Sequence, residues 1–465
     1  MSGLDFLAYF DTIDRRREDF VFSFAVFFVD DDCNLVGRKE EMFKKSRKIK
    51  AAVAFLAVLI IGLLVMMVIS LVTNSSERKG YARTNITRMV SDRVTVLDVD
   101  GLPLYSGEYA KDRVLREAMF PILGSNSEKK LLVDAEQQAV SYSRFFGPKV
   151  TDTTVNLTID RDLQVNAYSA LEESGFFGSI FIANYETGAI RAMVSYPSLD
   201  VKNTENEVKN DNTKKYLNRN MLAYTPGSVF KAVSAAAVLE NLSGASGKKF
   251  TCTGQYKDVV CYEKTKHGEE TLASVLLNSC NCGTAYFSSL ILPEDIEQFV
   301  SVSKICGSDL ISDFDGGCEQ GTFTTKDIGW ACVGQGEDNI TPIAVANYYA
   351  ALANGGIRRN FKLLRETEID KDSRIMMEST AAYITKALTP LAANQIKCKS
   401  FAKTGTAEVD NKPSHAWFVC ALTDEKAPKY VCVVMLEHAG GSQNAKKVAC
   451  DYINNNILTK GVRDK

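Results

Sequence analysis

The sequence predicts an α+β fold in which helices cover an antiparallel sheet, in a chain that also carries one membrane-spanning helix. Alternating apolar residues predict strands near both ends of the region after Pro148. These strands are 154–160, 179–184, 190–195, 416–422 and 430–436. Between them, the apolar run 232–239 has the length and alanine content of a buried helix. Strands at both ends of a region with helices between them indicate a sheet covered by helices.

An uncharged apolar run at residues 51–72 is long enough to span a bilayer as a helix. Five basic residues stand directly before it, between Lys44 and Lys50, and polar residues follow it. The positive-inside rule then places the N-terminus in the cytoplasm and everything after Thr73 outside. A cleaved signal peptide is the weaker alternative, because the run is longer than a typical signal-peptide core and no clear Ala-x-Ala site ends it. We therefore expect a single-pass protein of the cell (cytoplasmic) membrane.

These features divide the chain into four expected parts. They are a cytoplasmic segment at 1–50, a transmembrane helix at 51–72, a short membrane-proximal linker at 73–150 and a folded domain at 151–465. Within the linker, alternating residues around Asp100-Gly101 predict a β-hairpin. Our hypothesis for the first 41 residues is that they are an extension, because Met42 and the basic residues after it would make a normal start for a membrane anchor.

Charge and cysteine content narrow the classes of partner. A net charge of −2 with 24% charged residues describes an ordinary globular protein, and the absence of a broad basic face makes nucleic acid an unexpected partner. Eleven of the 12 cysteines follow the apolar run and would face the oxidising side, which permits disulfides. The best expected pair is Cys252 and Cys261, which close a short loop, and the second is Cys306 and Cys318.

A zinc site is not expected from these cysteines. The closest pair, Cys280-Asn-Cys282, is one residue tighter than the usual zinc-binding pair. The chain also has only three histidines. The cysteine and histidine pattern therefore does not favour a metal site.

A serine and a lysine three residues apart, Ser228 and Lys231, stand after the turn Pro226-Gly227 and at the start of the apolar run 232–239. This spacing places both side chains on one face of a helix, whose N-terminus directs amide groups at whatever the serine attacks. Burial lowers the pKa of a lysine, which makes Lys231 a candidate for the base that a serine nucleophile needs. The same spacing occurs five more times in the chain. The ordinary explanation for such a pair is a serine that caps a helix and a lysine that points to solvent. Only Ser228 has both the preceding turn and the following buried helix.

Two further short motifs offer polar groups to a cleft. Ser279-Cys280-Asn281 follows the helical stretch 272–278 and can present a hydroxyl and an amide together where the backbone turns. Lys403-Thr404-Gly405-Thr406 contains the one Lys-Thr-Gly of the chain, and on a strand edge it offers a cation, hydroxyls and a glycine that a substrate backbone can approach closely. Each motif by itself is more often an ordinary polar turn.

Ser-x-x-Lys, Ser-x-Asn and Lys-Thr-Gly, in this order, are the three motifs of penicillin-binding proteins and serine β-lactamases. The chain resembles this family over about residues 154–456, and most resembles its monofunctional class B members, the D,D-transpeptidases that cross-link peptidoglycan. Further resembling stretches are Leu157-Thr-Ile-Asp160, Asn184-Tyr-Glu-Thr-Gly188, Asn218-Arg219-Asn220, Gly334-Gln-Gly336 and His415-Ala-Trp417. The resemblance implies the penicillin-binding transpeptidase fold behind a short pedestal, and the chain has no room for the glycosyltransferase domain of class A proteins.

The resemblance also implies roles for the motif residues. Lys231, neutral, would take the proton from Ser228, which attacks the penultimate D-Ala carbonyl of a stem peptide. Ser279 would relay a proton to the leaving D-Ala, and Asn281 would orient the substrate amide. Substrate binding would involve a charged Lys403 together with Thr404, Gly405 and Thr406. The amides of Ser228 and Thr406 would form the oxyanion hole. This mechanism would need neither a metal nor an organic cofactor.

The same resemblance implies the partners and the alternatives. The partners would be peptidoglycan stem peptides and lipid-linked precursors, β-lactams, and a membrane glycosyltransferase of the division or elongation machinery. One alternative is a D,D-carboxypeptidase or β-lactamase on the same fold, in which water resolves the acyl-enzyme. Another is a catalytically silent cell-wall scaffold or β-lactam sensor, which the intact motifs disfavour.

Overall fold

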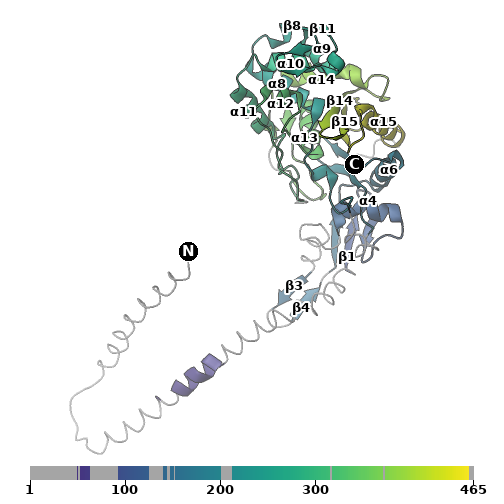
Figure 1. Cartoon of the computed structure of the whole chain (residues 1–465). Helices are drawn as coiled ribbons and strands as arrows, with labels where there is room; N and C mark the ends of the chain where they lie inside the picture. The colour runs from purple at the N-terminus through teal and green to yellow at the C-terminus, as the bar shows by residue number, and fades with distance from the viewer. Residues whose placement is uncertain are drawn as a thin grey trace, which may run out of the picture. The chain divides into compact units, whose positions relative to one another are not determined.

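The computed structural model describes residues 50, 53–62, 93–124, 140–143, 147–150, 152–200, 212–314, 317–369 and 372–459 (Figure 1). They fall in two compact units, Met1–Thr84 and Asn85–Lys465. In the first unit, residues 53–62 are helical. The remainder of the predicted span 51–72 and the predicted start at Met42 lie outside the described residues. No helix in the described part of the chain combines the length and the apolar character needed to cross a bilayer.

The centre of the second unit is a five-stranded sheet in the order β14-β15-β16-β6-β7, and every neighbouring pair is antiparallel. Its strands are β6 (Gly178–Asn184), β7 (Ile190–Tyr196), β14 (Ser400–Val409), β15 (Lys412–Leu422) and β16 (Tyr430–Leu436). Strands from both ends of the domain therefore lie side by side, as predicted. The prediction of an antiparallel sheet is confirmed.

Helices cover both faces of this sheet. Alternate residues of a strand point to opposite faces, and those of β16 enter two separate cores, with Val433 in one and Val434 in the other. The core around Val434 is closed by α6 (Arg161–Ser174) and α15 (Ser442–Tyr452). The core around Val433 is closed by α8 (Lys231–Asn241), α13 (Pro342–Ala353) and α14 (Glu378–Ala392) (Figure 1). A strand covered on both faces has no polar side, which explains why the central strands are apolar at nearly every position.

A second group of short elements lies beside α8. Its helices are α9 (Leu272–Asn278), α10 (Asn281–Ser288), α11 (Pro293–Ser303) and α12 (Ile328–Val333). Its strands are β8 (Lys249–Cys252), β9 (Gln255–Tyr256), β10 (Val259–Val260) and β11 (Gly268–Thr271). A reciprocal cap between Thr271 and Ser274 starts α9 directly at the end of β11. The short strand pair β12 (Ile357–Arg358) and β13 (Ser373–Arg374) joins α13 to α14.

The predicted strand 154–160 is wrong in its bounds and in its sheet. Strand β5 (Thr153–Asn156) pairs in parallel with β1 (Val94–Leu97) in a separate sheet of order β2-β1-β5. It ends early because the Asp160 carboxylate caps α6 by accepting the Leu163 amide at 3.0 Å. The predicted hairpin around Asp100-Gly101 is confirmed.

The remaining elements near the N-terminal side of this unit are the last strand of the small sheet, one helix and a separate two-stranded sheet. They are β2 (Pro103–Ser106), α4 (Arg113–Leu123) and the pair β3 (Val140–Ser143) and β4 (Gly147–Val150). Helix α4 is joined to the segment after β7 by a buried ion pair, in which the Arg116 guanidinium donates to both Asp200 oxygens at 2.8 and 2.7 Å. The boundaries at 72/73 and 150/151 stay predictions.

The structure contains no disulfide among the eleven cysteines that it describes. The predicted disulfide between Cys252 and Cys261 is therefore wrong, because their sulfurs lie 3.7 Å apart and both face the His267 ring. The second predicted disulfide, between Cys306 and Cys318, is likewise not formed in the part of the chain that the structure describes.

Candidate active site

The turn that carries Ser228 packs directly against β14. A short 3-10 turn, Gly227–Phe230, runs into α8 and confirms the predicted turn followed by a buried helix. Gly227 has a φ of +58°, and a Cβ atom there would lie 2.6 Å from the Thr406 carbonyl oxygen. At Gly405 a Cβ atom would lie 3.0 Å from the Pro226 carbonyl oxygen. The missing side chains of two glycines thus allow the Ser228 turn and the Lys-Thr-Gly strand to touch.

The side chain of Lys231 joins the first motif to the second. Lys231 is 1% exposed, and its Nζ donates to the Ser279 carbonyl and the Asn281 Oδ1, each at 2.6 Å. It also lies 3.2 Å from the Ser279 Oγ. Burial lowers the pKa of Lys231 to about 8, although nearby thiols, Cys280 first, act in the opposite direction. Within the described chain no hydrogen bond links Lys231 Nζ to Ser228, which sits three residues before it.

The backbone at Ser279 explains how this motif faces Lys231. Ser279 ends α9 in the left-handed conformation, with φ 54° and ψ 38°, and α10 then begins at Asn281. A non-glycine residue in this conformation is strained, and such residues cluster at functional sites. The Asn281 Nδ2 donates to the Val260 carbonyl at 3.0 Å, which turns the amide oxygen toward Lys231.

Lys403 completes the cluster from the edge strand β14. It is fully buried, and its Nζ donates to the Ser279 Oγ at 2.9 Å and to the Thr404 carbonyl at 3.1 Å. The Ser279 Oγ lies between two amines, which leaves its own hydrogen available to a third group. Burial, followed by the charge of Lys231, lowers the pKa of Lys403 well below its ordinary value. Burial thus lowers the pKa of both lysines, and a charged Lys403 beside a neutral Lys231 stays a prediction.

The two threonines of the third motif lie at the edge of the sheet, as predicted. Thr404 and Thr406 are both half-buried and alternate along β14 with the buried Lys403 and Gly405. The Thr406 hydroxyl accepts the Ser442 amide at 3.2 Å, and its carbonyl accepts the Gln335 side chain at 3.3 Å. Gly405 is required by packing against the turn, a reason that the sequence analysis did not give.

A polar network that the sequence analysis missed holds the chain leading to Ser228. Glu437, just after β16, accepts from the Arg219 Nε at 2.9 Å and from the Tyr224 hydroxyl at 2.7 Å. The Trp417 Nε1 donates to the Thr225 carbonyl at 3.0 Å. Arg219 and Trp417 belong to stretches that resemble the family, and Glu437 carries no sequence signal of its own. Together they attach the segment before the turn to the end of the sheet.

The fold and the three motifs agree with the comparison against known families. The penicillin binding protein transpeptidase domain matches residues 178–458. The chain belongs to this family. The transpeptidase-domain match begins at β6 and ends after α15, so it contains the whole central sheet and all three motifs.

Curated relatives of this transpeptidase-family chain are peptidoglycan enzymes. It is 28% identical over 232 residues to the peptidoglycan D,D-transpeptidase FtsI homolog of Chlorokybus atmophyticus, which covers 44% of this chain and 33% of the relative. It is 24% identical over 372 residues to the peptidoglycan D,D-transpeptidase PbpA of Mycolicibacterium smegmatis, covering 66% of this chain and 73% of the relative. The match thus spans a third of the length of the first relative.

A solved structure confirms the fold. Penicillin-binding protein A from Mycobacterium tuberculosis superposes with a TM-score of 0.66 at 21% identity, over 78% of this chain and 98% of that protein. The penicillin-binding transpeptidase fold predicted from the motifs is therefore confirmed.

Proposed function

We propose that the chain is a class B peptidoglycan D,D-transpeptidase that forms its acyl-enzyme on Ser228. The observation that carries the proposal is the convergence of three separated motifs. Lys231, Ser279, Asn281 and Lys403 form one hydrogen-bonded cluster beside the turn that presents Ser228. Such a cluster supplies a buried amine, a proton-relaying hydroxyl and an anion-binding cation to one nucleophile.

The first step would be proton transfer to Lys231. A neutral amine has two N–H donors and one lone pair, and the two 2.6 Å bonds of Lys231 occupy two donors. The remaining lone pair would take the Ser228 proton while the serine oxygen bonds to the penultimate D-Ala carbonyl carbon. The C–N bond to the terminal D-Ala then breaks, and the proton passes through the Ser279 hydroxyl to the leaving amine. A second stem-peptide amine would release the acyl group by the reverse sequence.

Ligand binding would set the charges of the two lysines. The terminal carboxylate of the substrate would lie beside Lys403, Thr404 and Thr406, and a nearby anion favours the ammonium form of a lysine. Because Lys403 and Lys231 share the Ser279 hydroxyl, a proton on Lys403 disfavours a second one on Lys231. Substrate binding would thereby prepare the neutral base.

We further propose a membrane location and partners. The apolar run 51–72 preceded by basic residues supports a single-pass anchor with the N-terminus inside. Structures of Mycobacterium tuberculosis penicillin-binding protein A are acyl-enzyme complexes with imipenem and penicillin G, which supports β-lactams as ligands here. A structure of a Helicobacter pylori penicillin-binding protein with MreC supports partners in the division or elongation machinery, among which we include a membrane glycosyltransferase. Protease added to intact spheroplasts should digest the chain beyond Thr73, and protection of that region would reverse the proposed orientation.

The activity test uses the full chain in detergent with a synthetic peptide ending in D-Ala-D-Ala and an amine acceptor. Mass spectrometry should find the acceptor-coupled peptide and free D-Ala. Hydrolysed peptide without coupled product would indicate a carboxypeptidase, and rapid turnover of penicillin would indicate a β-lactamase. Ser228→Ala should abolish the coupled product, whereas Ser400→Ala, in another Ser-x-x-Lys sequence, should retain it.

A further inference from the structure

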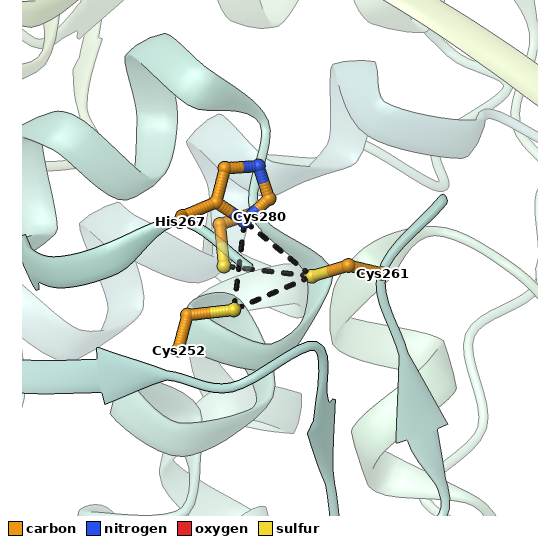
Figure 2. Close-up of side chains that lie close together, drawn as sticks. All are labelled: Cys252, Cys261, His267 and Cys280. Atoms are coloured by element: carbon orange, nitrogen blue, oxygen red, sulfur yellow. Dashed lines mark hydrogen bonds between the residues drawn. The ribbon is translucent and has the colours of Figure 1, made fainter. Parts of the chain in front are cut away.

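Three thiols and one imidazole converge, and one of the thiols is that of Cys280, the middle residue of the Ser-x-Asn motif (Figure 2). The Sγ atoms of Cys252, Cys261 and Cys280 and the Nδ1 of His267 all lie within 4.8 Å of one another. Figure 2 shows the four side chains pointing toward a common centre from different segments. We propose that these four side chains bind one zinc ion.

The distances fit a tetrahedral zinc ion. Zinc lies about 2.3 Å from thiolate sulfur and about 2.0–2.1 Å from imidazole nitrogen, so a tetrahedron places sulfurs about 3.8 Å apart and sulfur and nitrogen about 3.6 Å apart. The Cys261 sulfur lies 3.7 Å from both the Cys252 and the Cys280 sulfur. The His267 Nδ1 lies 3.5 Å from the Cys252 sulfur and 3.7 Å from the Cys261 sulfur. Each of these four distances is within about 0.2 Å of the tetrahedral value, and the other two pairs, Cys252–Cys280 and Cys280–His267, lie within 4.8 Å.

The chemistry of the ligands selects zinc among divalent cations. Thiolates with one imidazole in tetrahedral geometry are typical of structural zinc sites, and hard cations such as Mg²⁺ prefer oxygen ligands. Cys252, Cys261 and Cys280 are 1%, 3% and 0% exposed and His267 is half-buried, so the three sulfurs are shielded from water as in a structural zinc site. The Gly283 amide donates to the Cys280 sulfur at 3.2 Å, an outer hydrogen bond that stabilises a ligating thiolate.

A fifth cysteine lies close to the cluster without belonging to the tetrahedron. The Cys282 sulfur lies 3.4 Å from the Cys261 sulfur and donates its proton to the Val259 carbonyl at 3.5 Å. It therefore remains a thiol, and four ligands are left for the metal.

The metal would connect the Ser-x-Asn motif to a separate part of the fold. Cys280 stands between Ser279 and Asn281 and caps the start of α10, whereas Cys252, Cys261 and His267 lie on or beside β8, β10 and β11. Successive ligands are separated by 8, 5 and 12 intervening residues, a spacing that matches no short zinc motif. The expectation of no zinc rested instead on the tight pair Cys280-Asn-Cys282 and on the presence of only three histidines. The four ligands would act as positioning residues that hold Ser279 and Asn281 against Lys231. This positioning role rests on the proposed function, whereas the metal site itself does not.

Metal analysis of the full chain, purified without chelators, tests the site. We expect about one zinc per chain in the wild type, and loss of zinc in Cys252→Ala and His267→Ala. His267→Cys should retain zinc by supplying a fourth thiolate. Cys420→Ala is the matched control, because Cys420 is equally buried and faces another thiol, Cys432, across the central sheet. Wild-type protein that forms a penicillin adduct yet holds no stoichiometric zinc would overturn the proposal, as would unchanged zinc in both Ala variants.

A second measurement on the wild type keeps the proposal testable if the variants do not fold. After removal of zinc with a chelator, added Co²⁺ should give the absorption of a tetrahedral, sulfur-ligated cobalt ion; the weak spectrum of octahedral cobalt would overturn the site. Penicillin acylation should fall at least about tenfold on zinc removal and recover with Zn²⁺. Unchanged acylation would reject the positioning role, but the zinc site itself would still be supported. If the chain binds zinc but penicillin never labels it, the proposed function would be rejected and the zinc site would still be supported.

Discussion

Substituting Gly227 tests whether contact between the Ser228 turn and β14 builds the active site. An alanine there would keep a φ of +58°, which costs an L-residue roughly 1–2 kcal/mol. Its Cβ would also lie 2.6 Å from the Thr406 carbonyl oxygen, so the turn or the strand must move by about 0.8 Å to reach an ordinary contact of about 3.4 Å. A displacement of about 1 Å between reacting groups can cost about 10²-fold in rate. We therefore expect Gly227→Ala to slow penicillin acylation by about 10- to 100-fold.

Gly244→Ala is the matched control for backbone strain. Gly244 has a φ of +73°, but a Cβ atom there meets nothing within 4 Å, and the residue lies beyond the far end of α8. Both variants should lose roughly 1–2 kcal/mol from the strained backbone, with a larger loss for Gly227→Ala, as read from thermal denaturation. Only Gly227→Ala should lose acylation in a stopped-flow assay with a fluorescent penicillin. Equal acylation rates for the two variants would refute the role of this contact.

Further predictions concern three buried side chains that can gain or lose a proton. Because burial lowers the pKa of Lys231 to about 8 and the base must be neutral, acylation should rise about tenfold per pH unit below that value and level off above it; a rate that does not change between about pH 6 and 8 would contradict this. Lys403→Ala should weaken acylation more than Lys403→Arg, because arginine keeps a positive charge without the point-charge geometry of an ammonium; a wild-type rate in Lys403→Ala would exclude the proposed anion-binding role. Burial raises the pKa of Asp338 to about 7, so the folded state holds its proton more tightly than the unfolded chain and loses stability as the pH rises from about 4 to 7. Asp338→Asn should therefore raise the melting temperature at pH 8 more than at pH 4, and the reverse order would show that the ionised carboxylate is stabilised instead.

The parts of the structure that the sequence predicted are those specified by local patterns. The turn before Ser228 and the buried helix after it follow from Pro226-Gly227 and a run of small apolar residues. The strands 179–184 and 430–436 are mostly apolar and buried at every position because both faces of the sheet are covered. The resemblance to the family then related three motifs that no local pattern connects.

The parts that the sequence did not predict depend on contacts between distant segments. The alternation after Thr153 predicts a strand, but its partner in another sheet and its early end at Asn156 depend on β1 and on the cap of α6. Glu437 gives no signal until the fold places it beside Arg219, 218 residues away. The lowered pKa of Lys403 follows from its full burial beside Lys231, which motif spacing does not specify.

The central claim is that Ser228 is the nucleophile. Its most direct test is mass spectrometry of peptides from the full chain after reaction with penicillin. The account predicts one adduct, on the peptide that carries Ser228, and none in a Ser228→Ala variant that still melts cooperatively. An adduct on Ser279, Ser301 or Ser400, or labelling that persists in Ser228→Ala, would contradict it.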